Sequence, residues 1–471
     1  MRRLLRIVCS AAVILTALAL PAGANTATRA GSAATTFANW PAYLLGPTHP
    51  SFNSAAGAIT PAKVATLTRV WRWTPAAPTM AGQPGTSLFA SPTVFNGRIY
   101  IGANTGVFYA LDEATGQVLW HRFMGFVTAT TCATRGFNST ATVAPDPVSG
   151  ALSVYVTAAD GYLYALNAAN GALKWRSVVA IPSTTVNDYY NWASPTVVNG
   201  RIYMGLSSQC DSPLVMGGLK AYDQATGKLL AFYQTNPGGP TGPSIWSSAA
   251  ARPTSPYVYV TTGNGAGSDA VSVVQLDAAT LKKLSSWQVP SSEHGGDSDF
   301  GGSPTFFPAT LAGVDTPLVG ACNKNGVYYA LRRGNLAAGP VWRFNAGSPQ
   351  SGGGPQCDAA ALWNGAHLFV AGNATVIGGI TYKGSVRMLN PATGSPLWQR
   401  GLAGAVIGSP TLSGGGVLAA PTYGTAGLYL INAATGGVLR HIFSGQEFGQ
   451  PVFADNMLLA PTKDNGLWAY R

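Results

Sequence analysis

The sequence predicts an all-β fold, an eight-bladed β-propeller built from four-stranded antiparallel blades. A phrase of the form Ala-Leu-Asp-x-Ala-Thr-Gly, followed by a tryptophan, recurs about every 40 to 58 residues. An alternating apolar stretch precedes each copy, and the last copy ends before its final strand. The 58 glycines and 32 prolines among 471 residues suit many short strands joined by tight turns.

The repeated phrase is most complete at 110–120, where it reads Ala-Leu-Asp-Glu-Ala-Thr-Gly-Gln-Val-Leu-Trp. Its Asp can close a turn by accepting backbone hydrogen bonds, and its Gly supplies a positive φ that other residues tolerate poorly. Its Trp is a large apolar plate suited to packing between neighbouring sheets. Further copies, some of them degenerate, occupy 165–175, 221–233, 275–287, 330–342, 389–398 and 431–439.

The strands and the closure of the ring follow from these units. Stretches such as 98–102 and 257–261 alternate apolar and polar residues, which indicates strands. The eighth unit stops at Arg471, where its turn and last strand are due, whereas 70–73 reads Val-Trp-Arg-Trp with no turn phrase before it. We therefore expect a strand at about 70–74 to complete the C-terminal blade and close the ring. Seven blades is the alternative if the unit around Arg332 is not a blade.

The start of the chain has the pattern of a secretory signal peptide. Residues 1–24 combine a basic start, an apolar core and an Ala-Gly-Ala cleavage site. Residues 25–37 are small and polar and are expected to form a disordered tether, which leaves 38–471 as the propeller domain. No other stretch is apolar enough to cross a bilayer. The sequence thus predicts a secreted, extracellular protein without a membrane span, expected to be a monomer.

Charge and cysteine content narrow the function classes. The formal net charge is +11, but the basic residues are scattered, which favours diffuse surface charge over nucleic-acid binding. Four cysteines lie outside the signal peptide, and an even number in an oxidising compartment favours two disulfides. Of the three possible pairings we favour Cys132–Cys210 and Cys322–Cys357, because each would tie one blade to the next. No cysteine spacing indicates zinc or covalently attached haem.

Polar, irregular insertions interrupt the repeat and mark the candidate site. Loops of this kind in a propeller gather on one face around the central channel. Loops on a rigid scaffold are the usual carriers of function. The insertions lie at 132–139, 207–217, 244–248, 263–269, 294–304 and 350–358.

The turn phrase, together with Asn-Trp-Pro at 39–41, Ala-Ile-Thr-Pro at 58–61 and Val-Ala-Thr-Leu at 64–67, resembles the quinoprotein alcohol dehydrogenases and their repeat relatives. The resemblance runs from about residue 39 to the end of the chain. It implies an eight-bladed propeller that binds pyrroloquinoline quinone (PQQ) and calcium. Related propellers that lack the cofactor carry the same phrase, so the phrase itself is not specific for activity.

The resemblance assigns the cofactor contacts to three residues. Trp246 is similar to the tryptophan that forms the floor under the quinone, and a flat aromatic cofactor needs a flat aromatic floor. Lys324, in Asn-Lys-Asn-Gly, is similar to the basic residue that reaches the quinone oxygens, where it would stabilise negative charge. Arg135 is a weaker match to a cofactor-contacting arginine. Lys324 is also compatible with a plain Asn-Gly hairpin turn.

The resemblance also assigns a base and a metal site. Asp299, followed by Phe300, is similar to the catalytic aspartate, which would accept the alcohol proton and also ligate calcium. Asn264 lies as far after Trp246 as the family's calcium-ligating asparagine does. The family's calcium-ligating glutamate is missing, and Asp211 is the carboxylate available in that loop. Asn264 and Asp299 are also compatible with turn formation alone.

Two functions remain open on this evidence. The first is a PQQ- and calcium-dependent dehydrogenase that oxidises a small or polymeric alcohol or a sugar. The second is a non-catalytic scaffold whose loop face or blade edges hold a protein or a cell-wall glycan. No Ser/His/Asp arrangement indicates hydrolysis, because the five histidines lie in unrelated contexts.

Overall fold

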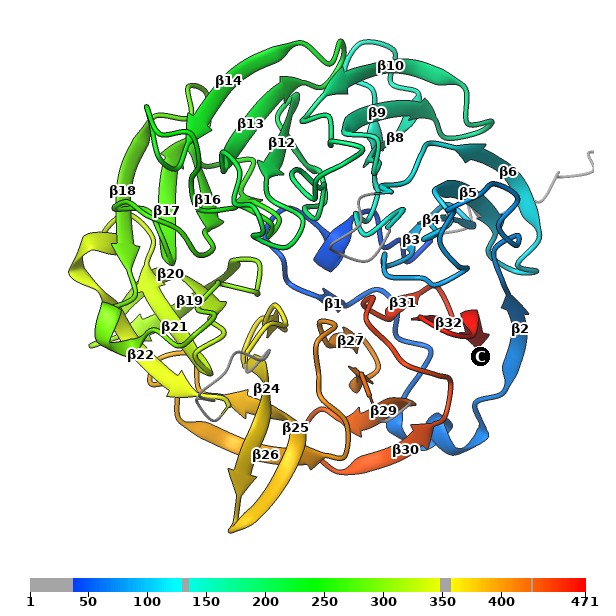
Figure 1. Cartoon of the computed structure of the whole chain (residues 1–471). Helices are drawn as coiled ribbons and strands as arrows, with labels where there is room; N and C mark the ends of the chain where they lie inside the picture. The colour runs from blue at the N-terminus through cyan, green and yellow to red at the C-terminus, as the bar shows by residue number, and fades with distance from the viewer. Residues whose placement is uncertain (1–36, 129–134, 348–356, 425–426) are drawn as a thin grey trace, which may run out of the picture. The chain divides into compact units, whose positions relative to one another are not determined.

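The computed structural model of the chain describes residues 37–128, 135–347, 357–424 and 427–471. These residues form a β-propeller whose blades are arranged in a ring, with the first strand of each blade at the centre and the last at the rim (Figure 1). Four short 3-10 helices lie among the strands of the described residues: η1 (Tyr43–Leu45), η2 (Pro61–Thr66), η3 (Ser291–Glu293) and η4 (Leu336–Ala338).

The first four blades follow one another in the chain. Blade 1 comprises β3 (Thr93–Phe95), β4 (Arg98–Gly102), β5 (Val107–Asp112) and β6 (Val118–Phe123). Blade 2 comprises β7 (Thr142–Pro145), β8 (Leu152–Thr157), β9 (Tyr162–Asn167) and β10 (Leu173–Val178). Blade 3 comprises β11 (Thr196–Val198), β12 (Arg201–Leu206), β13 (Gly218–Asp223) and β14 (Leu229–Gln234). Blade 4 comprises β15 (Ala250–Ala251), β16 (Tyr257–Thr261), β17 (Ser272–Asp277) and β18 (Lys283–Gln288).

Blades 5 to 8 continue the ring. Blade 5 comprises β19 (Thr305–Leu311), β20 (Val314–Cys322), β21 (Val327–Arg332) and β22 (Pro340–Asn345). Blade 6 comprises β23 (Leu362–Trp363), β24 (Leu368–Ile377), β25 (Ile380–Leu389) and β26 (Pro396–Leu402). Blade 7 comprises β27 (Thr411–Ser413), β28 (Val417–Thr422), β29 (Gly427–Asn432) and β30 (Val438–Ile442), joined by β1 (Phe52–Asn53). Blade 8 comprises β31 (Val452–Ala454), β32 (Met457–Thr462), β33 (Gly466–Tyr470) and β2 (Arg69–Trp73).

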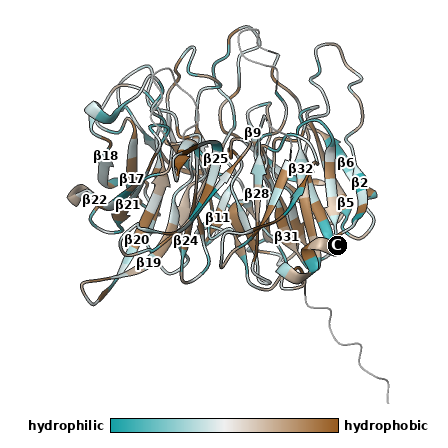
Figure 2. Ribbon diagram, turned by 90° about the horizontal axis from the view of Figure 1, so that it is seen from below, coloured by the Kyte–Doolittle hydropathy of each residue, from teal (hydrophilic) through white to brown (hydrophobic). Residues whose placement is uncertain are grey.

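The predicted ring closure is confirmed. Strand β2 pairs antiparallel with β33, so that Arg72 lies opposite Trp468 and the N-terminal strand completes the C-terminal blade. The unit around Arg332 forms a full four-stranded sheet, which makes eight blades and excludes the seven-bladed alternative. Apolar residues concentrate along the strands, as the side view shows (Figure 2).

The tryptophan of one blade packs on the turn glycine of the next. A Cβ added to Gly171 would lie 2.6 Å from the ring of Trp120 in the preceding blade, and one added to Gly394 would lie 2.4 Å from Trp342. The indole Nε1 of Trp120 donates to the carbonyl of Ala168 at 3.2 Å. The glycine therefore has two roles, because it adopts a positive φ and it leaves room for the indole.

We expect Gly394→Ala to destabilise the fold by about 2–4 kcal/mol, because it combines αL strain with a clash against Trp342. Gly200→Ala is the matched control, since Gly200 has φ +72 and open space around its Cβ position. It should cost only about 1 kcal/mol, from strain alone. Urea unfolding of both variants measures the difference, and equal losses would refute the packing role.

A segment before the closing strand runs beneath the ring and ties the blades together. We call residues 38–56 the strap. Its backbone carbonyls at 38, 40, 41, 47, 48, 50 and 51 accept hydrogen bonds from blades 8, 1, 2, 4, 5, 6 and 7 respectively. The side-chain Nδ2 of Asn53 donates to three carbonyls, those of Ala38, Asn39 and Phe453. Helix η1, within the strap, lies at the centre of the ring (Figure 1).

Two carboxyl groups meet where the ring closes. Glu113, 4% exposed, faces Asp455, whose Oδ1 accepts the strap's Ala38 amide at 2.5 Å. Burial raises the pKa of Glu113 to about 8, and the neighbouring Asp455 carboxyl adds to the rise. The folded chain therefore keeps a proton on Glu113 at pH values where the unfolded chain has lost it.

This raised pKa predicts that the contribution of Glu113 to stability is present below about pH 4.5 and is lost as the pH rises towards 8. We expect Glu113→Gln to be more stable than the native chain at pH 8 by about 1–3 kcal/mol. At pH 5 the two should differ little. Chemical unfolding at both pH values checks this, and an unchanged difference between them would contradict the assignment.

Among the described residues, no helix is long and apolar enough to span a membrane. The predicted signal peptide and most of the predicted tether lie outside the described residues, so the boundaries at 24 and 37 stay predictions.

Candidate active site

A ring of hydroxyl groups surrounds the central channel. The residue two positions before the first strand of most blades is Ser or Thr, and in four blades its backbone N–H donates to the hydroxyl of the equivalent residue in the next blade. The bonds within this hydroxyl ring are 2.8 to 3.0 Å long. The ring is interrupted where Ala360 and Gln450 stand in place of a hydroxyl residue. Its other members are Ser91, Thr140, Ser194, Ser248, Ser303 and Ser409.

Sequence analysis missed this hydroxyl ring, although a signal was present. Ser-Pro-Thr occurs at 91–93, 194–196, 303–305 and 409–411, each time just before or at the start of a first strand. The serine takes part in the hydrogen bonds between neighbouring blades described above. The hydroxyl of the threonine donates to a backbone carbonyl of the next blade, as Thr93 Oγ1 does to the carbonyl of Ala141 at 2.7 Å. These repeated contacts set the width of the channel.

A cavity of about 430 Å³ opens above the hydroxyl ring. It brings together four of the six predicted site residues: Trp246, Lys324, Asp299 and Asp211 all line it. The strap contributes Tyr43 to its wall. The remaining two, Asn264 and Arg135, do not line the cavity, but each contacts residues that do.

Lys324 is the centre of a charged cluster in this cavity. Its ammonium Nζ donates to Asp297 Oδ2 and to Asp299 Oδ2, both at 2.8 Å, and its side chain is only 15% exposed. The backbone joins the same groups, because the Lys324 amide donates to the Asp299 carbonyl at 2.9 Å. This backbone hydrogen bond therefore holds together the two loops that carry the lysine and the aspartate.

Asn264 supports this cluster from the next loop. Its amide N–H donates to Asp299 Oδ1 at 2.5 Å, and its Nδ2 donates to Asp297 Oδ1 at 2.8 Å. The side-chain oxygen Oδ1 of Asn264 accepts a hydrogen bond from the Ser298 amide at 3.0 Å. Asn264 therefore orients the two aspartates, and its side-chain oxygen is turned to the Asp297–Asp299 loop.

Burial and charge shift the proton affinities of the cluster in opposite directions. Burial raises the pKa of Asp299 to about 6, although the Lys324 ammonium opposes the rise. Burial alone would lower the pKa of Lys324, but the surrounding carboxylates, Asp299 foremost, raise it above its ordinary value. Lys324 therefore stays charged at neutral pH, whereas Asp299 changes charge just below neutrality.

The indole of Trp246 and two further aromatic rings form the walls. The Lys324 Nζ lies 5.1 Å from the ring centroid of Trp246, whose buried Nε1 has no hydrogen-bond partner among the described residues. Arg135 packs its guanidinium 5.1 Å from the ring of Trp192 and 5.5 Å from that of Phe89. Both of these rings line the cavity, which places Arg135 behind its aromatic wall.

The residues present fit a flat aromatic group with polar edges. The cavity offers an aromatic plate, an ammonium above it and an orphaned indole N–H. It also fits a cation, since the carboxylates of Asp211, Asp297, Asp299 and Asp358 line it together with one lysine. Among the described residues, however, no three His, Cys, Asp or Glu side chains are already gathered as metal ligands.

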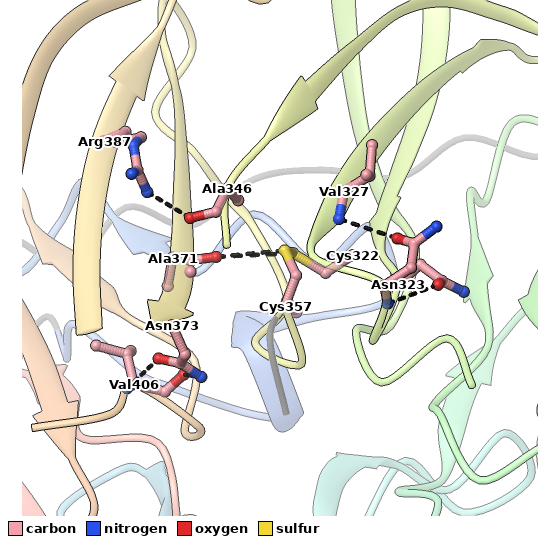
Figure 3. Close-up of a disulfide and its surroundings, with 12 residues drawn as sticks. Cys322, Asn323, Val327, Ala346, Cys357, Ala371, Asn373, Arg387 and Val406 are labelled. Carbon is pink, nitrogen blue, oxygen red and sulfur yellow. Dashed lines mark hydrogen bonds between the residues drawn. A yellow bond between two sulfur atoms is a disulfide. The ribbon is translucent and has the colours of Figure 1, made fainter. Parts of the chain in front are cut away.

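The predicted disulfide Cys322–Cys357 is confirmed. It joins the end of β20 in blade 5 to the segment before β23 in blade 6, with a Cα–Cα distance of 5.0 Å (Figure 3). Cys210 is also disulfide-bonded. Its predicted partner, Cys132, lies outside the described residues, so the Cys132–Cys210 pairing stays a prediction.

Asp358 is the site residue that sequence reasoning missed. It directly follows Cys357, lines the cavity, and has a buried Oδ1 without a hydrogen-bond partner among the described residues. Burial raises its pKa to about 6. The disulfide was the available signal, because it brings the residue after Cys357 close to the residues after Cys322.

Comparison with known proteins identifies the family of the chain. Residues 40–344 match the profile of the "glucose/ethanol/alcohol dehydrogenase, beta-propeller domain" family. Residues 335–420 and 382–471 match the profile described as outer membrane protein assembly factor BamB.

Individual proteins similar in sequence to this chain are named as alcohol dehydrogenases. Quinohemoprotein alcohol dehydrogenase ADH IIB of Pseudomonas putida is 28% identical, over 53% of this chain and 40% of its own length. Polyvinylalcohol dehydrogenase of a Sphingopyxis species is 26% identical, over 57% of this chain and 46% of its own length. The chain thus spans less than half the length of these relatives.

Solved structures show the same fold. Quinohemoprotein alcohol dehydrogenase from Comamonas testosteroni superposes with a TM-score of 0.69 at 18% identity, over 92% of this chain and 80% of that one. BamB from Moraxella catarrhalis superposes with a TM-score of 0.54 at 14% identity, over 86% and 97%.

The fold and site define an eight-bladed PQQ-type β-propeller with a charged cavity on its axis. The chain belongs to the glucose/ethanol/alcohol dehydrogenase β-propeller family.

Proposed function

We propose that the chain is a secreted, PQQ-dependent dehydrogenase that oxidises an alcohol or a sugar. The observation that carries the proposal is the convergence of Trp246, Lys324 and Asp299 on one cavity. These are the residues that the family resemblance assigned to the floor, the charge-stabilising cation and the base. A passive scaffold gives no reason for a buried carboxylate, a buried ammonium and an aromatic plate to meet there.

The residues of the chain divide the work as follows. Trp246 supports the flat face of the quinone, and Lys324 holds positive charge where negative charge develops. Asp299 accepts the hydroxyl proton of the substrate at Oδ2, while Oδ1 stays fixed by the Asn264 amide. Arg135 keeps the aromatic wall in place through Trp192 and Phe89. When bound, the quinone supplies the carbonyl that accepts the two electrons of the alcohol as hydride.

Calcium is part of the proposal, with Asp299, Asp211 and the side-chain oxygen of Asn264 as its ligands. Asp211 lies beside Ser208 and Ser244 in the cavity wall, and its carboxylate accepts from the Ser208 hydroxyl. The carboxylate surplus of the cavity supports a cation there. Asn264 would have to release the Ser298 amide or share its oxygen with it.

Titration of the purified protein with PQQ, with and without calcium, tests the function. Binding should quench the fluorescence of Trp246 and shift the quinone absorbance, and alcohols should then reduce an artificial electron acceptor. Trp246→Phe serves as the control for the fluorescence signal. Absence of both binding and acceptor reduction, with any alcohol or sugar, would refute the proposal.

A scaffold function has one specific observation in its favour, the match of residues 335–471 to the BamB profile. A scaffold that binds a protein or a cell-wall glycan through its loops or edges requires no intact cavity. Under that reading, Asp299→Asn would leave binding unchanged. The same variant therefore separates the two functions.

A further inference from the structure

We propose that Asp358 is a positioning residue for Lys324, held in place by the Cys322–Cys357 disulfide. The inference rests on the proposed function, because it concerns how the lysine is kept in place while Asp299 acts as a base. Three observations carry it, namely a covalent link, a pair of glycines and an uneven distribution of charge.

The covalent link joins the two segments that bear these residues. Lys324 lies two residues after Cys322, and Asp358 lies one residue after Cys357. Both cysteines are at most 1% exposed, and their sulfurs lie 3.8 and 3.3 Å from the carbonyl oxygen of Ala371 on β24 (Figure 3). The bond therefore fixes the approach of blade 6 to the lysine of blade 5.

Two glycines make room for this approach. A Cβ added to Gly301 would lie 2.1 Å from Asp358 Oδ1, and one added to Gly302 would lie 3.2 Å from the Cβ of Cys322. The Asp358 carboxyl therefore packs directly on the backbone that follows Asp299. The Gly-Gly pair thus admits a third carboxyl group, that of Asp358, beside Asp297 and Asp299.

The charges show what Asp358 would do there. The Lys324 ammonium has three N–H groups, and two of them bond Asp297 and Asp299. Asp358 forms no ion pair with Lys324 in the structure, although its negative charge helps to raise the pKa of the lysine, and its Oδ1 has no hydrogen-bond partner among the described residues. To act as a base, Asp299 must turn Oδ2 to the substrate hydroxyl, which weakens its bond to Lys324. The unpartnered Oδ1 of Asp358 then takes up the ammonium and keeps it over Trp246.

A double-mutant cycle on thermal stability tests the pairing without any cofactor. In the native chain, Asp358→Asn should lower the melting temperature by about 2 °C, because the buried ammonium loses a compensating charge. In a Lys324→Met chain the same substitution should raise the melting temperature, because it removes a buried carboxylate that has lost its cation. The same sign in both backgrounds would overturn the proposal.

Kinetics give the second measurement. Asp358→Asn should lower kcat about tenfold with KM nearly unchanged, and Asp358→Glu should restore most of the loss. When Cys322→Ala and Cys357→Ala are combined to remove the disulfide, Asp358→Asn should change the melting temperature by nearly the same amount in the native and the Lys324→Met backgrounds. If no alcohol is oxidised at all, the function fails while the thermal cycle still decides the role of Asp358. Full kcat in Asp358→Asn would overturn that role.

Discussion

Asp299→Asn is expected to lower alcohol oxidation by about 10³-fold while leaving the fold and quinone binding intact. Asparagine keeps the shape of the side chain and the acceptor for the Asn264 amide, but it cannot take a proton. Because burial raises the pKa of Asp299, the native enzyme should lose kcat/KM as the pH falls and this carboxylate takes up a proton. Steady-state rates between pH 5 and 9, with quinone titration of both proteins, check this.

Asp297→Asn is the matched control for that experiment. Asp297 lies in the same loop and bonds the same ammonium, but Lys324 holds its pKa below the usual range even though burial opposes this. Because a carboxyl group with a lowered pKa is the weaker base, the Asp297→Asn variant should lose much less activity than the Asp299→Asn variant. If Asp297→Asn is the inactive variant, the base has been assigned to the wrong carboxylate.

Lys324→Met is expected to destabilise the fold by about 3 kcal/mol and to abolish catalysis. The substitution keeps most of the side-chain volume but leaves Asp297, Asp299 and Asp358 without a cation. Asp299 and Asp358 have pKa values of about 6 even with the lysine beside them, and removing it raises both, so most of this destabilisation should disappear at pH 5, where both are protonated. Unfolding in urea at pH 5 and pH 8 measures the effect.

Lys283→Met supplies the comparison for Lys324→Met. Lys283 pairs with a single carboxylate, Asp269, at 2.8 Å, and its side chain is 38% exposed. It should cost about 1 kcal/mol or less. Equal costs for the two lysines would show that the cavity is not the low-dielectric environment that the mechanism requires.

The fold could be predicted from the sequence because each blade repeats the same local solution. The Asp-to-Gly turn and its tryptophan are legible within one unit, and the unfinished last unit required the strand at Arg69–Trp73. The strap was not predicted, since its carbonyls bond strands hundreds of residues away and its own sequence has no repeat.

The site was predicted only where the family resemblance named a residue. Trp246, Lys324 and Asp299 were found in this way, and they do line the cavity. Asn264 was expected as a metal ligand, whereas in the structure its side chain bonds Asp297 and Ser298. Asp358 ends the insertion at 350–358 that marked a candidate loop, but it was not singled out, because the resemblance names no residue there and the effect of a disulfide spanning 35 residues was not followed to its neighbour.

The strap also has a consequence for biosynthesis. It is made early, yet the partners of its carbonyls are spread through blades 1, 2 and 4 to 8, and Ala38 awaits Asp455 near the end of the chain. In a nascent chain the strap can therefore pair only step by step as the blades are made, and both Ala38 and β2 lack their partners until the eighth blade is complete. Such dependence on distant partners makes folding slow and nearly all-or-none. A chain truncated within its last blade would lack β33, the partner of β2, and the ring could not close. A truncation before Asp455 would also remove the partner of Ala38 at the start of the strap.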